Sequence, residues 1–183
     1  MTAVEHKSSD PPVGFELVQL GGAFATHNGP LYARWHNERL QLGFRVGPQH
    51  VNPGQNCHGG MLGMFVDILI SSAAQYQSDI TRQFLPTITL QMDFLASAPL
   101  GSWVQGQADI LRVTRNLIFS QGLVHADERP ALRASGIFKR GPLLPDSEND
   151  HALRLSGMPQ RHSGAGEKQP GQRVWVRRSL GSS

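Results

Sequence analysis

Residues 52–76 read NPGQNCHGGMLGMFVDILISSAAQY, and this stretch organises the rest of the chain. It starts as a polar turn, passes through His58-Gly59-Gly60, and becomes an apolar run that predicts a helix with almost no polar face before Ser71. A helix that is apolar nearly all round is buried, not laid on a surface. The apolar run 61–70 is too short to cross a membrane. We therefore expect one long buried helix.

Two features of this helix can carry chemistry. Asp67 is the only charged residue between Gly59 and Ser78, and a carboxylate is rarely buried without a partner, because removing its water is costly. Gly59 and Gly60 have no side chains to shield the unpaired N–H donors at the positive end of the helix dipole. A polarised oxygen can therefore approach the helix start closely.

The spacing of these two features indicates a dimer. At about 1.5 Å rise per residue, Gly59 and Asp67 of one chain lie about 12 Å apart along the helix axis, too far to touch one reacting group. They can cooperate only if the donor end of one helix meets the carboxylate of another. That arrangement requires two antiparallel helices and two equivalent sites related by a two-fold axis.

The spaced set Asn52, His58-Gly59-Gly60 and Asp67 resembles the motif of the PaaI-type (phenylacetate-pathway) acyl-CoA thioesterases of the hotdog fold, over residues 28–140. The resemblance implies an α+β hotdog domain in which an antiparallel sheet of five to six strands wraps one helix. It also implies a homodimer or homotetramer with active sites at the subunit interface, an acyl-CoA substrate, and no metal or other cofactor.

The resemblance also implies roles for these residues. Asp67 would be the catalytic carboxylate, acting as general base or as nucleophile, and Gly59 N–H would polarise the thioester carbonyl. His58 would shape the loop and reach the thioester oxygen, while Asn52 would hold the attacking water or the substrate. The alternatives are structural: a paired carboxylate at Asp67, a hydrogen-bonding His58 and a turn residue at Asn52.

A further catalytic candidate lies on the strand after the helix. Residues 87–94 alternate cleanly, with Ile88, Leu90, Met92 and Phe94 on one face and Thr87, Thr89, Gln91 and Asp93 on the other. The resembling family places a Ser or Thr near here that bonds the acid or the nucleophilic water. Thr89 is the predicted match and Thr87 the alternative, against the plain reading of a strand threonine.

Substrate-binding candidates fall into two groups. Gly60 and Met61 open the central helix, next to the expected thioester. Polar residues at strand ends and turns could hold the phosphates and nucleotide of coenzyme A, although turn arginines are commonly just solvated; these are Arg112, Arg115, Asn116 and Lys139.

Cys57 and His58 do not form a nucleophile pair, because adjacent side chains point in different directions and no third orienting group is evident. We expect Cys57 to be buried and inert. The residues around His58 also lack the spacing of a zinc site.

The flanking segments predict strands. Leu31–His36 and Leu40–Val46 form an expected hairpin, and the strands after the helix are 87–94, 103–113, 117–126 and 131–138. Turns at this spacing favour an antiparallel meander. Two strands, one helix and four strands are typical of a sheet wrapped around a helix.

Charge divides the chain. Residues 151–183 carry a net charge of +5 and residues 1–150 carry −2, so the basicity belongs to the tail and does not predict nucleic-acid binding by the core. We expect a lead-in over 1–27, a hotdog domain over 28–140 and a basic, disordered tail over 141–183. No signal-peptide pattern opens the chain, which favours a cytoplasmic protein without a membrane partner.

The sequence thus predicts a hydrolase that cleaves an acyl-CoA thioester to the free acid and CoA. Two alternatives stay open on the same fold: a non-catalytic acyl-CoA-binding protein, and a hydratase or dehydratase acting on an acyl thioester. The acyl chain, the oligomeric state and the role of the tail are left open.

Overall fold

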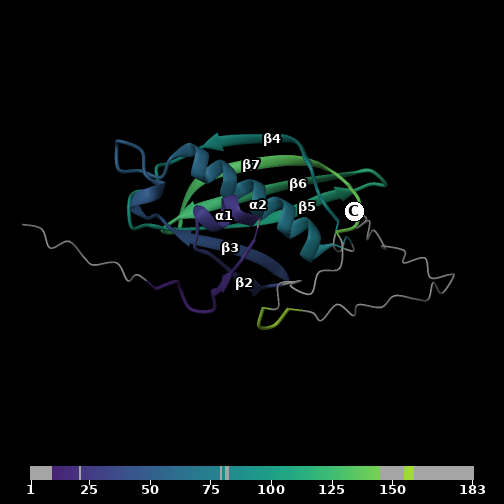
Figure 1. The fold of residues 1–183 in the computed structure, drawn as a ribbon, viewed down its shortest axis with the longest axis horizontal. Coiled ribbons are helices and arrows are strands. Elements are labelled where there is room, and N and C mark those ends of the chain that lie inside the picture. The colour runs from purple at the N-terminus through teal and green to yellow at the C-terminus, as the bar shows by residue number, and fades with distance from the viewer. Residues whose placement is uncertain (1–9, 21, 79, 81–82, 145–154, 159–183) are drawn as a thin grey trace, which may run out of the picture.

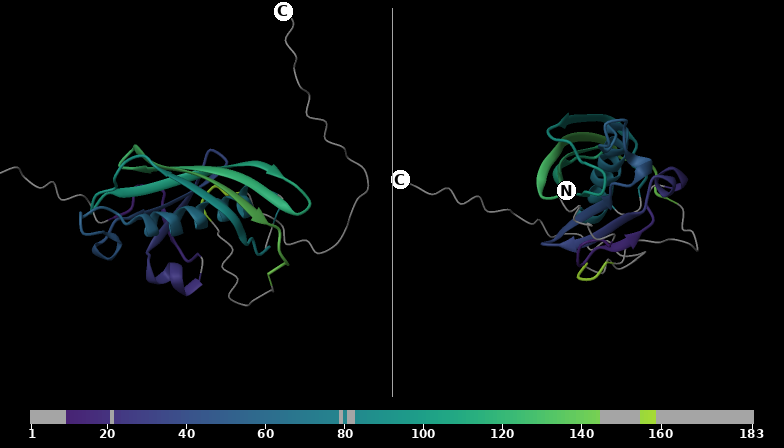
Figure 2. Two further views of the ribbon diagram at one scale, coloured as in Figure 1. Left: turned by 90° about the horizontal axis from the view of Figure 1, so that it is seen from above. Right: turned by 90° about the vertical axis from the view of Figure 1, so that its left-hand side faces the viewer.

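The computed structural model describes residues 10–20, 22–78, 80, 83–144 and 155–158. Its central element is the helix α2 (Gly59–Gln77), which lies across one face of an antiparallel sheet (Figure 1). The sheet curls around this helix (Figure 2). The fold class is therefore α+β with the hotdog arrangement, as predicted from the apolar run and the strands on either side of it.

The sheet has seven strands in the order β1-β2-β3-β5-β6-β7-β4, one or two more than expected. All neighbouring pairs are antiparallel. The strands are β1 (Glu16–Val18), β2 (Leu31–His36), β3 (Arg39–Arg45), β4 (Thr87–Phe94), β5 (Trp103–Val113), β6 (Leu117–Ala126) and β7 (Arg129–Lys139). The added strand is β1, which pairs with β2 at the end of the sheet opposite β4.

The predicted hairpin is confirmed, and its turn chemistry is clear. Asn37 and Glu38 between β2 and β3 both have positive φ, at 50° and 59°. A two-residue turn with both φ values positive matches the right-handed twist of the flanking strands. Asn tolerates this conformation better than most residues, so the sequence fixes this turn locally.

The core lies between α2 and the sheet. Phe65, Val66, Leu69 and Ile70 of α2 are fully buried against the strands. The close approach depends on Gly106 of β5, where a Cβ atom would come within 2.7 Å of Leu69 Cδ2. The expectation that α2 is a buried helix is thus confirmed.

One helix was not predicted. The short helix α1 (Gly22–His27) and the 3-10 turn η1 (Pro48–His50) precede α2. In the left view of Figure 2, α1 lies farther from strands β5–β7 than α2 does. It therefore lies on the side of α2 that faces away from strands β5–β7.

The ends of the chain are described in part. Residues 1–9, 145–154 and 159–183 lie outside the described residues, and with them part of the expected lead-in and most of the expected tail. Within the tail, Leu155 is buried and joins the core, and the Ser156 N–H and hydroxyl both donate to Glu16 Oε1 of β1. These residues of the tail thus pack against the domain.

Candidate active site

The start of α2 presents a backbone donor. His58 is the N-cap, and its Nδ1 accepts the Gly60 N–H at 2.9 Å. A Cβ atom at Gly60 would lie 3.1 Å from that nitrogen, so glycine keeps the cap open. Among the described residues no acceptor bonds the N–H of Gly59. A carbonyl oxygen from a ligand could therefore take that donor at the positive end of the helix dipole.

Asp67, two turns further along α2, is half-buried and has a side-chain partner. Its Oδ1 accepts the hydroxyl of Thr87 at 2.7 Å, across a sequence separation of 20 residues. One oxygen of the carboxylate is thus held by β4. The threonine that contacts the carboxylate is the residue that the sequence offered as the alternative.

A β-bulge explains why Thr87, and not Thr89, meets Asp67. The register of β4 on β7 shifts between these two threonines: Thr87 pairs with Phe138, and Thr89 pairs with Ile137. Paired residues share a face of the sheet, and neighbours on one strand point to opposite faces. Thr87 therefore lies with the buried Phe138 on the helix side, and Thr89 lies on the other side. The predicted alternation is wrong at Thr87, because the extra residue of the bulge places Thr87 on the face opposite to the predicted one.

Asn52 closes the loop that leads into α2. Its Oδ1 accepts the N–H groups of Gly54 and Asn56, at 2.9 and 3.3 Å. The loop is also held by a bridge between Val51 and Cys57. The side-chain oxygen of Asn52 is therefore used by the turn, as the structural alternative predicts, which leaves its amide N–H groups for a ligand.

Gly59 and Asp67 lie on one stripe of α2 that faces β4. A Cβ atom at Gly59 would meet Phe94 at 3.3 Å, a Cβ atom at Gly63 would meet Met92 at 3.4 Å, and Asp67 bonds Thr87. The stripe runs i, i+4, i+8, so helix and strand lie antiparallel along it. The two candidate catalytic groups thus sit at opposite ends of one strand.

That strand forms an apolar edge of the sheet. β4 is the last strand in the sheet order and pairs only with β7 within the described residues. Ile88 is 55% exposed, Phe94 54% and Leu95 55%. Large apolar side chains on an unpaired edge are typical of a surface that pairs with another chain.

Four coenzyme A candidates lie at the end of the sheet where Thr87 begins β4. Arg112 is the last residue but one of β5, Lys139 ends β7, and Asn116 lies in the turn between β5 and β6. The Lys139 N–H donates to Pro86 O, beside Thr87. The side chains of Arg112, Arg115, Asn116 and Lys139 are all exposed. They are separated from the Gly59 end of the stripe by the length of β4.

Cys57 is buried, with 6% of its surface exposed, and burial raises the pKa of its thiol to about 12. The reactive form of cysteine is the thiolate, which this environment suppresses. The expectation of a buried Cys57 is confirmed, and its inertness stays a prediction. No cluster of three His, Cys, Asp or Glu side chains suited to a metal ion occurs among the described residues.

A cleft of about 300 Å³ opens at the N-terminus of α2. Its lining includes the motif residues His58 and Gly60, and also Met61 and Met64 of the same helix. Its other walls come from α1 and the η1 segment, including Phe24, Asn28 and His50. Sequence patterns did not indicate these three residues, because α1 is too short for a recognisable period and the other two lie in a loop and a 3-10 turn.

Comparisons with known proteins indicate the family and the fold of this chain. Residues 54–132 match the family model of the thioesterase superfamily. A Pseudomonas aeruginosa protein named "Putative esterase PA0474" is 27% identical over 128 residues, which cover 69% of this chain and 95% of that protein.

Solved structures show the same fold. The Escherichia coli PaaI protein from the phenylacetic acid degradation operon has a TM-score of 0.57 at 18% identity, covering 67% of this chain and 86% of its own. A hypothetical thioesterase from Streptococcus pneumoniae, solved with coenzyme A, has a TM-score of 0.55 at 14% identity, covering 63% and 88%.

No helix in the described part of the chain is long and apolar enough to cross a membrane. The fold, the spaced motif around α2 and the match over residues 54–132 point in one direction. The resemblance is therefore confirmed: the chain has the hotdog fold of the PaaI-type thioesterases and carries a thioesterase-superfamily match through its central helix and sheet.

Proposed function

We propose that this protein is an acyl-CoA thioesterase whose active sites form between two copies of the chain. The observation that carries the proposal is the stripe of α2 that faces β4, with an N–H at Gly59 that no described residue accepts and a hydrogen-bonded carboxylate at Asp67. Eight residues of helix separate them by about 12 Å, so one chain cannot apply both to one carbonyl.

A second copy resolves this separation. If two chains pair antiparallel along β4, the Gly59 end of each stripe meets the Asp67 end of the other. The exposed apolar side chains Ile88, Phe94 and Leu95 support pairing at this edge, because their burial would be favourable. A two-fold axis then generates two equivalent sites, each with a donor from one subunit and a carboxylate from the other.

The chemistry needs no group beyond these residues and water. The Gly59 N–H donates a hydrogen bond to the thioester oxygen, which gains negative charge as the carbonyl carbon becomes tetrahedral. Asp67 either takes a proton from the attacking water or attacks the carbon itself, and water then releases the acyl group from it. The C–S bond breaks, a C–O bond forms, and the CoA thiolate takes up a proton. Thr87 holds one oxygen of Asp67, so the other is free to act.

Charge at the sheet end supports coenzyme A as the leaving group. Arg112, Arg115 and Lys139 are exposed near the N-terminal end of β4, which is the end that carries Asp67. Arginine and lysine are the usual protein partners of phosphate groups. The nucleotide of CoA would therefore lie on the subunit that supplies the carboxylate.

The test is CoA release from a panel of acyl-CoA esters by wild type, Asp67→Asn and Asp93→Asn. Asp93 is the matched control, because it is a carboxylate on β4, the strand that carries Thr87, and it bonds Arg133 on the far side of the sheet. Asp67→Asn should lower kcat by about 10²- to 10⁴-fold, the usual contribution of a catalytic carboxylate. Asp93→Asn should keep near wild-type activity.

Two results would speak against the proposal. Wild type that binds the esters but releases no CoA would identify an acyl-CoA-binding protein instead of a hydrolase. Equal losses in both variants would show that Asp67 acts through stability. A melting curve of each variant separates that case from a loss of chemistry.

A further inference from the structure

The lining of the cleft at the N-terminus of α2 includes an aromatic side chain that takes no part in the proposed hydrolysis. The cleft lining includes Met61 and Met64 of α2 and Phe24 of the short helix α1. Phe24 is 69% exposed, although it is a large aromatic side chain beside a concave surface. An exposed aromatic at the wall of a cleft gains by being covered when a ligand enters.

Hydrogen bonds of one buried residue, His50, join the segment after α1 to the loop before α2. The Gly47 N–H donates to His50 Nδ1 at 3.0 Å, so the proton lies on Nε2, which donates to Asn28 O at 3.0 Å just after α1. The carbonyl of His50 in turn accepts the N–H of His58, the N-cap of α2, at 2.7 Å.

His50 thus connects the chain that follows α1 to the start of α2. Asn28 completes the connection, since both its backbone N–H and its side-chain amide donate to Phe24 O, at 3.2 and 2.8 Å. These bonds hold the backbone of α1 at Phe24 in place beside the cleft. A wall held in this way can select among ligands by size.

The chemistry of the cleft favours the acyl group over the rest of the substrate. Phe24, Val51, Met61 and Met64 supply apolar surface, and the polar side chains of the lining already bond backbone groups of the chain; these are Asn28, Gln49, His50 and His58. The pantetheine arm of CoA contains two amide groups that require hydrogen-bond partners, which the methionine side chains do not supply. Methionine adapts its shape to different apolar ligands.

From these contacts we infer that the cleft binds the acyl group of the thioester and that Phe24 sets the upper limit of its length. This inference rests on the proposed function. The cleft volume is about 300 Å³. A dry cavity of roughly 150 Å³ holds one benzene molecule, so this cleft suits a compact acyl group of about eight to twelve carbons. Long unbranched chains would collide with Phe24.

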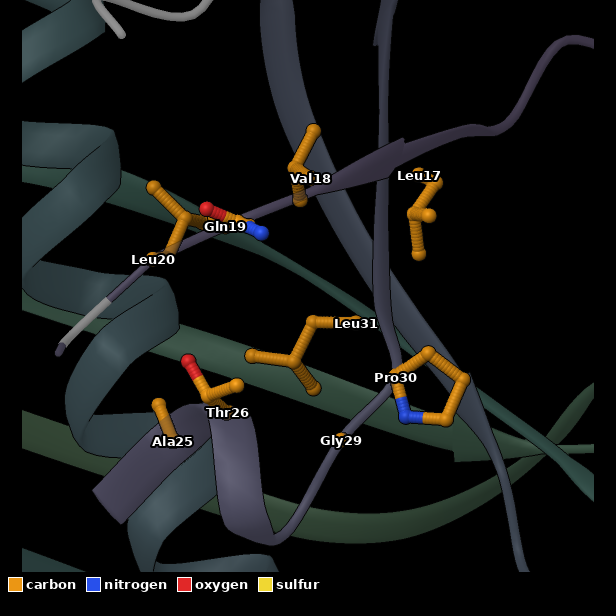
Figure 3. A pocket seen from close by; sticks show the side chains of 9 residues that line it. All are labelled: Leu17, Val18, Gln19, Leu20, Ala25, Thr26, Gly29, Pro30 and Leu31. Atoms are coloured by element: carbon orange, nitrogen blue, oxygen red, sulfur yellow. The ribbon is translucent and has the colours of Figure 1, made fainter. Parts of the chain in front are cut away.

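A second cavity provides the control. Figure 3 shows it on β1, α1 and the start of β2, with a volume of about 300 Å³ and a lining that includes Leu17, Ala25 and Leu31. It uses other side chains of α1 than Phe24 and contains neither His58 nor Gly60. Leu17 is an exposed apolar residue, like Phe24, so its removal tests whether any apolar loss near α1 has the same effect.

The experiment measures kcat/KM for hexanoyl-, octanoyl-, lauroyl- and palmitoyl-CoA with wild type, Phe24→Ala, Phe24→Trp and Leu17→Ala. Phe24→Ala should raise the palmitoyl-to-octanoyl ratio at least about tenfold, because a single methylene in an apolar pocket already changes the rate by that order. Phe24→Trp should lower the ratio, and Leu17→Ala should leave it unchanged. Inhibition by free CoA should be equal in all four proteins.

Each other outcome overturns the inference in a recognisable way. An active wild type whose chain-length profile is the same in Phe24→Ala and Phe24→Trp would refute the role of Phe24 while leaving the thioesterase intact. A weaker inhibition by free CoA in Phe24→Ala would place pantetheine in the cleft. A wild type that cleaves none of the esters would overturn the proposed function and this inference together.

Discussion

The hydroxyl of Thr87 donates to Asp67 Oδ1 at 2.7 Å, and this bond ties the strand after the central helix to the only carboxylate of that helix. Thr87→Val keeps the shape of the side chain and removes the bond. A hydrogen bond to a charged group contributes about 1.5–3 kcal/mol, so kcat/KM should fall roughly 10- to 100-fold. Steady-state CoA release measures this loss.

Thr89→Val is the control for that measurement, because it makes the same change two residues away on the other face of the sheet. It should leave kcat/KM within about twofold of wild type. If Thr89→Val lost more activity than Thr87→Val, the bulge would not orient β4 as described.

The N-cap of α2 predicts a stability effect at His58. Its Nδ1 accepts the Gly60 N–H, and loss of an N-cap costs about 0.5–2 kcal/mol. His58→Ala should therefore lower the midpoint of urea unfolding, whereas His58→Asn, which can cap, should keep it. A variant pair with equal midpoints would show that the cap does not contribute. Activity lost in His58→Asn, at full stability, would identify a direct contact with the substrate.

His50 predicts a pH dependence of stability. Burial lowers the pKa of His50 below its ordinary value of 6.5. As the pH falls below about 6.5, the unfolded chain takes up a proton that the folded chain refuses, so the free energy of unfolding decreases until the pH reaches the folded-state pKa. Urea unfolding of wild type at fixed protein concentration should show this decrease between about pH 7 and pH 5.5.

His50→Gln removes the titrating group and serves as the reference for that slope. The variant should be less stable than wild type at neutral pH, because it loses the bonded ring, but its stability should fall less on acidification. Parallel pH profiles for the two proteins would mean that another group controls the dependence.

We expect Cys57 to take no part in catalysis. Its thiol is buried and its pKa is raised to about 12, so almost no thiolate exists near neutral pH. A thiol reagent should react slowly with the native protein and rapidly in urea, and Cys57→Ala should keep kcat within about twofold. Rapid loss of activity on thiol modification of the native protein would contradict the buried, inert role.

The central helix and most of the strands were predictable because the sequence patterns that indicate them are local. The apolar run that became α2, the strands 103–113 and 117–126, and the turns between strands follow from periodicity and turn residues. The site motif was predictable for a related reason: a lone carboxylate in an apolar helix and glycines at its start are visible without knowledge of tertiary contacts.

The elements that were missed depend on contacts distant in sequence. The bulge that turns Thr87 toward Asp67 is a mismatch between two strands and leaves no mark on β4 alone. Helix α1 has six residues and is placed by the bond of His50 to Asn28 O. Burial of Leu155 likewise needs the core to exist before a tail residue can join it.

The donor role of Gly59 can be isolated by two substitutions that share a Cβ atom. Gly59→Pro removes the N–H, and proline is well tolerated at the first position of a helix. His58 already has the extended conformation that a following proline requires, with φ −63° and ψ 139°. Gly59→Pro should lower kcat about 10²- to 10³-fold. Gly59→Ala keeps the N–H, needs only a small shift of the exposed Phe94, and should remain active.

The central claim is that each site takes Gly59 from one subunit and Asp67 from the other. The most direct test mixes Gly59→Pro and Asp67→Asn proteins in equal amounts, after subunit exchange in mild denaturant. Half of the dimers are then mixed, and each contains one intact site of two, so activity should recover to about a quarter of wild type. Parent variants treated alone should stay inactive. If the mixture stays inactive although mixed dimers form, both groups act within one chain or not at all, and the shared-site account is wrong.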